Sequence, residues 1–175
     1  MREVTFRVAN SLDNYIARKD GSVDWLLSGD EAASVMTEFW KTIDTVVMGR
    51  KTYEPVLKSG KPFPTYPGVK NYVLSRTLKE SPDQNVEIIK EDAVEFIRKL
   101  KTEEGKDIFI MGGGLLAKSL FEANLIDEVG VNIHPVLLGS GIPLFFEMSC
   151  QINLGLIECR RFKNGCVSVI YRVKS

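Results

Sequence analysis

The sequence predicts an α/β fold built on a mixed, mostly parallel central sheet with helices packed against it. Two observations lead to this prediction. Short apolar runs alternate along the chain with segments whose apolar residues recur at helical spacing, a pattern typical of strands joined by helical crossovers. The C-terminal part instead contains two strand-like runs, 154–162 and 167–173, around the turn residues Asn164 and Gly165, which predicts an antiparallel hairpin.

Length and composition are those of a globular protein of moderate size. At 175 residues, 44% of them apolar and 26% charged, the chain fits a single domain, residues 1–175. Its 23 basic and 23 acidic residues cancel, which disfavours a protein that binds nucleic acid through charge. No apolar run is long enough for a membrane helix, so we expect no membrane partner. The 3 cysteines lack the spacing of a metal site, which favours reduced thiols, a cytoplasmic location and no bound metal.

The first predicted elements are a strand, a long loop and a helix. Residues 4–9 alternate apolar and polar side chains, as a half-buried strand does. The following stretch is rich in turn residues as far as Leu26, and a long loop inside a compact domain is usually functional. Ser28 and Glu31 have the spacing of a capping box, so we expect a helix that starts there and runs to Thr42.

Buried strands and helices alternate through the rest of the chain. Continuous apolar runs bounded by turn residues are typical of strands that are covered on both faces. The expected strands are 44–48, 71–74, 86–89, 108–111 and 128–134, and the expected helices follow Gly49, cover 92–104 and follow Gly114. Residues 135–146 are predicted to form an apolar, glycine-rich connection.

The glycines 112–114 stand between the strand 108–111 and a helix that begins at Leu115. Without a Cβ atom, glycine lets the backbone turn sharply or approach another group closely. The first N–H groups of the helix would face whatever lies over the turn, which is the arrangement of an anion site. Two alternatives stay open. One is a tight connection without a ligand; the other is a Rossmann fingerprint, Gly112-x-Gly114-x-x-Ala117, for which the following acidic residue is missing.

Three predicted strand ends carry groups that suit an anion. These groups are Gly49, Arg50, Lys51 and Thr52 after the second strand, Ser75 and Arg76 after the third, and the three glycines. Because the carboxyl ends of parallel strands meet at one edge of a sheet, together they suit an extended, multiply phosphorylated ligand such as a dinucleotide. The cations favour NADP over NAD, whose ribose usually meets a carboxylate. Basic residues at strand ends are often simply solvated, and that alternative stays open.

Several segments together resemble the dihydrofolate-reductase-like superfamily. They are ANSLDNYIA, VVMGRKTYE, NYVLSR, IFIMGGGLLAKSLFEANLIDEV and NIHPVLLGSGIPLF, in the family's order over residues 4–146. The resemblance is closest to the branch that contains the C-terminal reductase domain of the bifunctional deaminase-reductase of riboflavin biosynthesis. It implies a three-layer fold and an NADPH-dependent reductase of a small heterocycle, either pterin-like or ribosylamino-pyrimidine-like.

The resemblance also implies which residues hold the cofactor. Ala9 and Ile16 would lie beside the nicotinamide, and Ser75 and Arg76 would bind the 2′-phosphate of the adenosine. The other expected cofactor residues are Gly49, Arg50, Lys51, Thr52, Leu74, Met111, Gly113, Gly114, Leu115 and Leu116. In relatives two adjacent glycines at this turn are joined by a cis peptide, which would be the bond between Gly112 and Gly113 here.

On the substrate side fewer residues match the family. Asp30 follows Trp25 at the family's spacing, although the proline of the family's pattern is missing. Asp30 would be the proton donor and a substrate contact, or else a first-turn carboxylate that only stabilises the helix dipole. Asn132 stands where relatives place a hydroxyl residue against the substrate. His134, the 1 histidine of the chain, is expected to be a structural residue.

The sequence leaves two functions open. The first is an NADPH-dependent reductase of a small heterocycle. The alternative is a catalytically degenerate protein of the same fold that still binds NADP(H), because the substrate-side pattern is incomplete. Relatives in this branch are commonly homodimers, so we expect a homodimer with its interface at residues 135–146 and the last hairpin.

Overall fold

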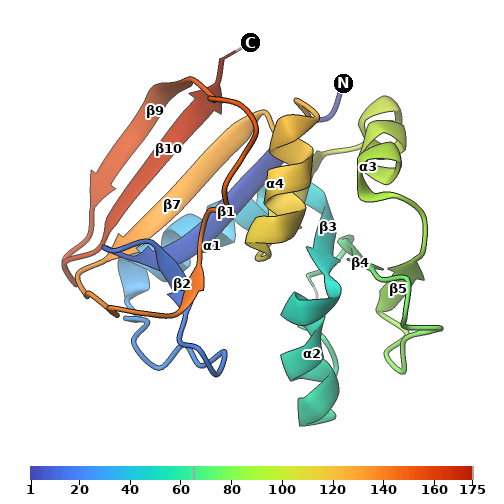
Figure 1. The fold of residues 1–175 in the computed structure, drawn as a ribbon, viewed down its shortest axis with the longest axis horizontal. Coiled ribbons are helices and arrows are strands. Elements are labelled where there is room, and N and C mark those ends of the chain that lie inside the picture. The colour runs from blue at the N-terminus through green and yellow to red at the C-terminus, as the bar shows by residue number, and fades with distance from the viewer. Residues whose placement is uncertain (65, 175) are drawn as a thin grey trace.

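The computed structural model describes residues 1–64 and 66–174, and an eight-stranded sheet runs through it in the order β5-β4-β3-β6-β1-β7-β10-β9 (Figure 1). The strands are β1 (Val4–Ser11), β2 (Tyr15–Ala17), β3 (Ile43–Gly49), β4 (Lys70–Leu74), β5 (Val86–Ile89), β6 (Asp107–Met111), β7 (Glu128–His134), β8 (Ile142–Pro143), β9 (Leu154–Arg161) and β10 (Val167–Val173). Neighbouring strands from β5 to β7 are parallel, whereas β10 is antiparallel to β7 and β9 is antiparallel to β10. The predicted mixed, mostly parallel sheet with a C-terminal hairpin is confirmed.

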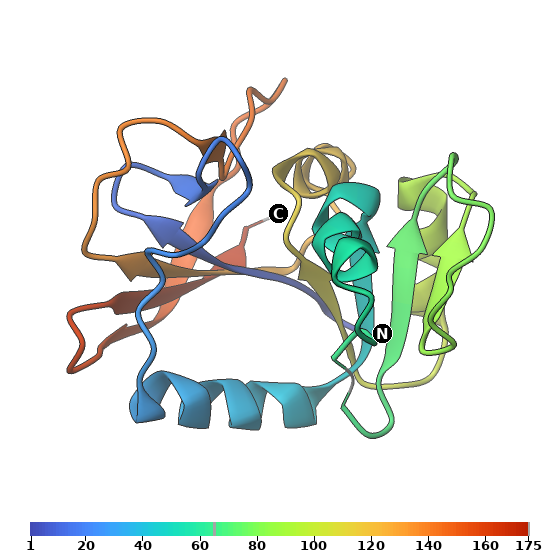
Figure 2. The same cartoon turned by 90° about the horizontal axis from the view of Figure 1, so that it is seen from below.

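Helices cover both faces of this sheet. They are α1 (Asp30–Thr42), α2 (Arg50–Ser59), α3 (Ala93–Thr102) and α4 (Gly114–Glu122). Figure 2 shows α1 along one side of the sheet and α4 along the other, which gives the three layers that the resemblance implied. Within the described residues, no helix combines the length and apolar character that crossing a membrane requires.

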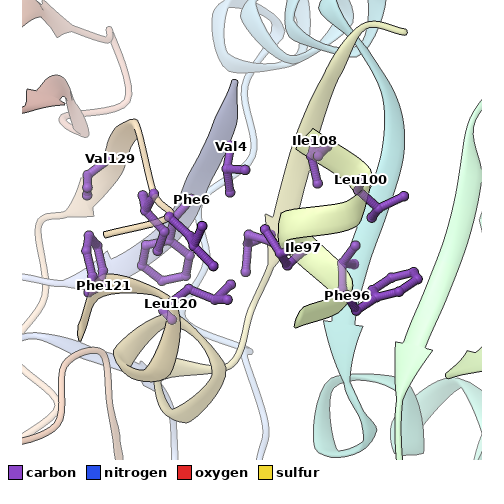
Figure 3. Packing of buried hydrophobic residues seen from close by; sticks show 14 of the residues in the cluster. Val4, Phe6, Phe96, Ile97, Leu100, Ile108, Leu120, Phe121 and Val129 are labelled. Carbon is purple, nitrogen blue, oxygen red and sulfur yellow. The ribbon is translucent and has the colours of Figure 1, made fainter. Parts of the chain in front are cut away.

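The larger core lies between the sheet and the helices α3 and α4. Alternate residues of β1 point to this side, so Val4 and Phe6 are fully buried there. Phe6 meets Phe121 of α4 edge to face, with ring centroids 6.1 Å apart. Ile97 of α3 completes the contact between the two helices and the strands (Figure 3).

A second core lies on the α1 side of the sheet. The intervening residues of the strands point this way, and Phe109 of β6 packs edge to face against Phe39 of α1 at 5.1 Å. Met48 of β3 and Tyr53 of α2 are fully buried in the same cluster. Because the central strands β3 and β6 bury both of their faces, their continuous apolar runs in the sequence are explained.

The predicted capping box at the start of α1 is wrong. The residue before the helix is Gly29, and no side chain caps the helix there. Glu31 instead accepts a hydrogen bond from the backbone N–H of Lys163 in the β9–β10 turn, at 2.8 Å. A contact with a distant segment therefore replaces the local bond that the spacing of Ser28 and Glu31 predicted. Asp92, by contrast, does cap α3 with its carboxylate.

Two connections that the sequence left without strands pair with each other. β2 lies in the long loop after β1, and it forms an antiparallel pair with β8 of the 135–146 connection. Asp13 ties the same two segments, since its carboxylate accepts from the backbone N–H groups of Leu138 at 3.1 Å and Gly139 at 2.7 Å. A hydrogen bond from the Ser11 hydroxyl, together with these N–H groups, lowers the pKa of Asp13. The pairing fixes both segments near the carboxyl end of β1.

Candidate functional site

The three strand ends that carry the predicted anion-binding groups lie side by side. β3 stands between β4 and β6 in the sheet. Gly49 pairs with Leu74 of β4, and Met48 pairs with Met111 of β6, so the three strands end at the same level. The sheet therefore brings the segments after these strands together along one edge.

Two helices begin at this edge, and neither has a side-chain cap. α2 starts directly after Gly49, and α4 starts directly after Gly113. Since no side chain bonds their first turns, the free N–H groups and the positive ends of both helix dipoles are available to a ligand. This arrangement suits a group with more than one phosphate.

The turn before α4 touches the first turn of α2. Gly112 has φ +63°, and a Cβ atom added to it would lie 2.7 Å from the Thr52 hydroxyl oxygen. Gly113 also has φ +63°. Positive φ angles of this kind favour glycine, so the turn requires glycine at both positions.

The cis peptide expected between Gly112 and Gly113 is absent. No cis peptide bond occurs in residues 1–64 or 66–174. The two left-handed glycines make this turn with a trans bond between them.

The other side of the α4 start is closed by the 135–146 connection. A Cβ atom on Gly114 would lie 2.4 Å from the carbonyl oxygen of Leu144 and 3.0 Å from the ring of Phe146. Gly114 is thus required by close packing rather than by its backbone angles. Gly49 differs, because a Cβ atom there would meet nothing within 4 Å.

Arg50 joins α2 to the segment after β4. Its guanidinium donates to Glu54 at 2.7 Å and to the Thr77 hydroxyl at 2.6 Å, and the bond from Arg50 lowers the pKa of Glu54. Lys51 and Arg76 are exposed nearby. Positive charge therefore surrounds the edge where the two uncapped helices begin.

Ser75 has a different place from the one expected of a phosphate ligand. Its side chain is buried, and its hydroxyl oxygen accepts from the backbone N–H groups of Leu78 at 3.1 Å and Thr77 at 3.3 Å. The hydroxyl shapes the turn that presents Arg76. Whether it also contacts a ligand stays a prediction.

The remaining expected cofactor residues lie on β1, β2, β4, β6 and α4. Ile16, Leu74 and Leu116 are partly buried against the core on the α3–α4 side. Met111 packs against the α1-side core, and Leu115 is exposed on α4. Ala9 lies at the end of β1, where it pairs with Asn132 of β7.

On the substrate side, Asp30 does not lie among the ends of β3, β4 and β6. Asp30 is exposed at the start of α1, in a groove of about 210 Å³ that it shares with Phe162 and Asn164 of the β9–β10 turn. A second groove, of about 310 Å³, continues under α1 and is lined by charged side chains that include Arg7 and Arg160. Asp30 thus borders a solvent-filled groove and is not enclosed.

A buried cluster around His134 was not found from the sequence. The imidazole is 2% exposed and lies edge-on to the Trp25 ring, with centroids 5.4 Å apart. Its Nδ1 is 3.1 Å from the backbone nitrogen of Leu27 and 3.4 Å from the Cys166 sulfur, and its Nε2 is 3.3 Å from the Asn132 amide. Burial lowers the pKa of His134. Leu27 and Cys166 come from distant segments, so local spacing could not predict these contacts, whereas Asn132 lies two residues before His134 on β7.

No metal centre is formed by the side chains that the structure describes. Within residues 1–64 and 66–174, no group of three histidine, cysteine, aspartate or glutamate side chains could hold a metal ion.

Known proteins are similar to this chain in sequence and in fold. The chain is 38% identical over 162 residues to the uncharacterised protein YwjB of Bacillus subtilis strain 168, covering 92% of each. A solved structure from Shewanella sp. PV-4, whose name provisionally assigns it to riboflavin biosynthesis, has a TM-score of 0.86 at 29% identity and covers 100% of both chains. The Thermotoga maritima diaminohydroxyphosphoribosylaminopyrimidine deaminase/5-amino-6-(5-phosphoribosylamino)uracil reductase shares the fold, with a TM-score of 0.73 at 17% identity over 99% of this chain and 57% of that one. The family model of the RibD C-terminal domain matches residues 2–168, and the chain belongs to this family.

Proposed function

We propose that the protein is an NADPH-dependent reductase that transfers a hydride to a small heterocycle, either pterin-like or ribosylamino-pyrimidine-like. One observation carries the proposal. Two uncapped helix starts and the exposed cations Lys51 and Arg76 meet at adjacent strand ends, as an extended anion with several phosphates requires. Membership of the RibD C-terminal domain family supports the same assignment.

The chain's own residues supply binding and orientation in this proposal. The first turns of α2 and α4 would hold the pyrophosphate, and the guanidinium of Arg76 would pair with the 2′-phosphate. The end of β1 at Ala9 would lie along the nicotinamide. NADPH, when bound, supplies the hydride, so the protein needs only to orient the ring and exclude water.

Cofactor choice tests the proposal directly. NADPH should raise the melting temperature more than NADH does, because only NADPH carries the 2′-phosphate. Arg76→Ala should weaken NADPH binding by about 10- to 100-fold, which corresponds to a charged hydrogen bond of about 1.5–3 kcal/mol. NADH binding should stay unchanged in the same variant.

Arg98→Ala is the matched control, since Arg98 is exposed on α3 and pairs with Glu95 of its own helix. It should bind NADPH as the unaltered protein does. Equal stabilisation by both cofactors would exclude a site that selects NADPH, and stabilisation by neither would exclude a cofactor site.

A second candidate function is a catalytically degenerate protein that binds NADP(H). The exposed position of Asp30 favours it, because a proton donor usually works in a site that excludes water. NADPH oxidation followed by absorbance, with dihydrofolate and with the ribosylamino-pyrimidine phosphate as substrates, separates the two candidates. NADPH binding without oxidation of either would favour the degenerate protein.

We also propose that the protein forms a homodimer. Leu137 and Phe145 in the 135–146 connection, and Leu154, Leu156 and Ile157 on the edge strand β9, are large apolar side chains exposed to solvent. An edge strand with apolar side chains invites pairing. Light scattering after gel filtration should give twice the mass of 19.6 kDa, and a monomer at micromolar concentration would contradict the proposal.

A further inference from the structure

Packing holds the C-terminal half of α1 more firmly than its N-terminal half. Phe39 is the only buried residue of the 13 in this helix, all of which the structure describes. Its ring packs against Phe109 of β6, and the neighbouring Trp40 stacks on Tyr66 with ring centroids 4.1 Å apart. The side chains of residues 30–37 are exposed or half-buried. A segment with few buried apolar contacts opens at a low cost in free energy, so the N-terminal half of α1 is the part expected to open first.

A solvent-filled groove separates α1 from the β9–β10 hairpin. It consists of three adjoining cavities of about 210, 380 and 310 Å³. Glu31 and Phe162 line both the first and the second cavity, and Ser34 and Arg160 line both the second and the third. The groove therefore follows the helix from its start to its last turn, and the N-terminal half does not rest on the hairpin.

Figure 2 shows the start of α1 beside the β9–β10 turn, where one contact bridges the groove. The Glu31 carboxylate accepts a hydrogen bond from the backbone N–H of Lys163 at 2.8 Å, and the Lys163 ammonium lies 3.8 Å from the same carboxylate. Because the Lys163 side chain is 91% exposed, water weakens the ion pair, and the backbone hydrogen bond is the stronger link. In the described part of the chain, no other hydrogen bond or ion pair joins residues 30–37 to a different helix or strand or to the β9–β10 turn.

We propose that the hydrogen bond from Lys163 to Glu31 is a latch on the N-terminal half of α1. While the bond is made, the helix is held at both ends. When it breaks, residues 30–37 open as a unit, and Phe39 keeps the C-terminal half in place. Since Asp30 adjoins Glu31, the latch also sets the position of the Asp30 carboxylate. The width of the groove at this end of α1 thus depends on one hydrogen bond rather than on packing.

Native-state hydrogen exchange of the free protein measures the opening residue by residue and needs neither cofactor nor substrate. In Glu31→Ala, the amides of residues 34–37 should exchange about tenfold faster than in the unaltered protein, equivalent to 1.4 kcal/mol. The amides of residues 40–42 and of β1 should exchange at unchanged rates, because Phe39 holds the end of the helix. Unchanged exchange at residues 34–37, or an acceleration that is as large at residues 40–42 or in β1, would overturn the proposal.

Three matched variants separate the latch from other effects of the substitution. Asp30→Ala removes the other acidic residue of the first turn, so it reports the loss of charge at the helix dipole and should accelerate exchange by less than about threefold. Lys163→Ala keeps the backbone N–H and should leave exchange unchanged. Glu31→Gln keeps an acceptor oxygen and should protect residues 34–37 better than Glu31→Ala does. A tenfold acceleration in Asp30→Ala or Lys163→Ala, or equal exchange in the two Glu31 variants, would show that charge or the ion pair holds the helix instead.

Discussion

Two regions of the molecule are formed by different kinds of groups. One is the edge of the sheet where β3, β4 and β6 end, and the other is the cluster around His134. At the edge, backbone groups make the site: left-handed glycines, uncapped helix starts and close approaches at Gly112 and Gly114. Around His134, side chains make it, and they come from Trp25, Asn132 and Cys166. The first region therefore depends on shape and is sensitive to one added methyl group. The second depends on where protons lie and is sensitive to changes that keep the shape.

The largest expected effect concerns shape alone. Gly114→Ala places a methyl group against the Leu144 carbonyl oxygen and the Phe146 ring, so the free energy of unfolding should fall by about 1–3 kcal/mol, as for other overpacked sites. Gly49→Ala is the control, and it should change the stability by less than about 0.5 kcal/mol. Urea denaturation measures both. A similar stability for the two variants would show that the 135–146 connection moves to make room for the added methyl group.

Gly49→Ala should nevertheless affect the ligand. Its Cβ atom would stand in open space at the start of α2, where the proposal puts a phosphate. We expect about tenfold weaker NADPH binding, equivalent to 1.4 kcal/mol, by isothermal titration calorimetry. If the affinity is unchanged while the protein remains folded, no phosphate approaches this helix start.

The contribution of the His134 cluster to stability should depend on pH. Burial lowers the pKa of His134 below its ordinary value of 6.5. Just below that pH, His134 therefore binds a proton in the unfolded chain but stays neutral in the folded chain. The free energy of unfolding should therefore fall on acidification from pH 6.5 down to the folded pKa, by at most about 1.4 kcal/mol per pH unit. Urea denaturation across this range measures the slope. His134→Gln should remove it, and a slope that persists in the variant would assign it to another group.

The smallest expected effect is at the exposed cation. Glu54→Gln releases Arg50 from its ion pair, so NADPH binding should become tighter by less than about threefold, as expected for a surface pair. Salt should abolish the difference, because screening acts on exposed charges. Calorimetry at low and high ionic strength provides the comparison. Weaker binding would mean that Glu54 orients Arg50 productively.

The backbone region was the part that the sequence could predict. The apolar run before the glycines at 112–114 predicted β6 and the turn to α4, because strand, glycine and helix follow each other locally. The same holds for Gly49 between β3 and α2. Because the strands are parallel, their carboxyl ends could also be expected to meet at one edge of the sheet. The ligand contacts of these residues remain predictions.

The rest depends on contacts between distant segments. Glu31 bonds to Lys163 and not to the start of its own helix, and β2 pairs with β8 across more than 120 residues. His134 was expected to be structural, but two of its three polar partners, Leu27 and Cys166, lie far from it in sequence. Periodicity detects neighbours within one element and carries no signal for such pairs.

The central position of β1 has a consequence for how the chain folds during synthesis. Val4 pairs with Ile108 and Thr5 with Glu128, so both neighbours of this strand are made more than 100 residues after it. Until then, the apolar side chains of Val4 and Phe6 have no sheet to enter. Pairings so distant in sequence form slowly and leave apolar surface open to aggregation. The growing chain therefore cannot complete the centre of its sheet until β7 has left the ribosome.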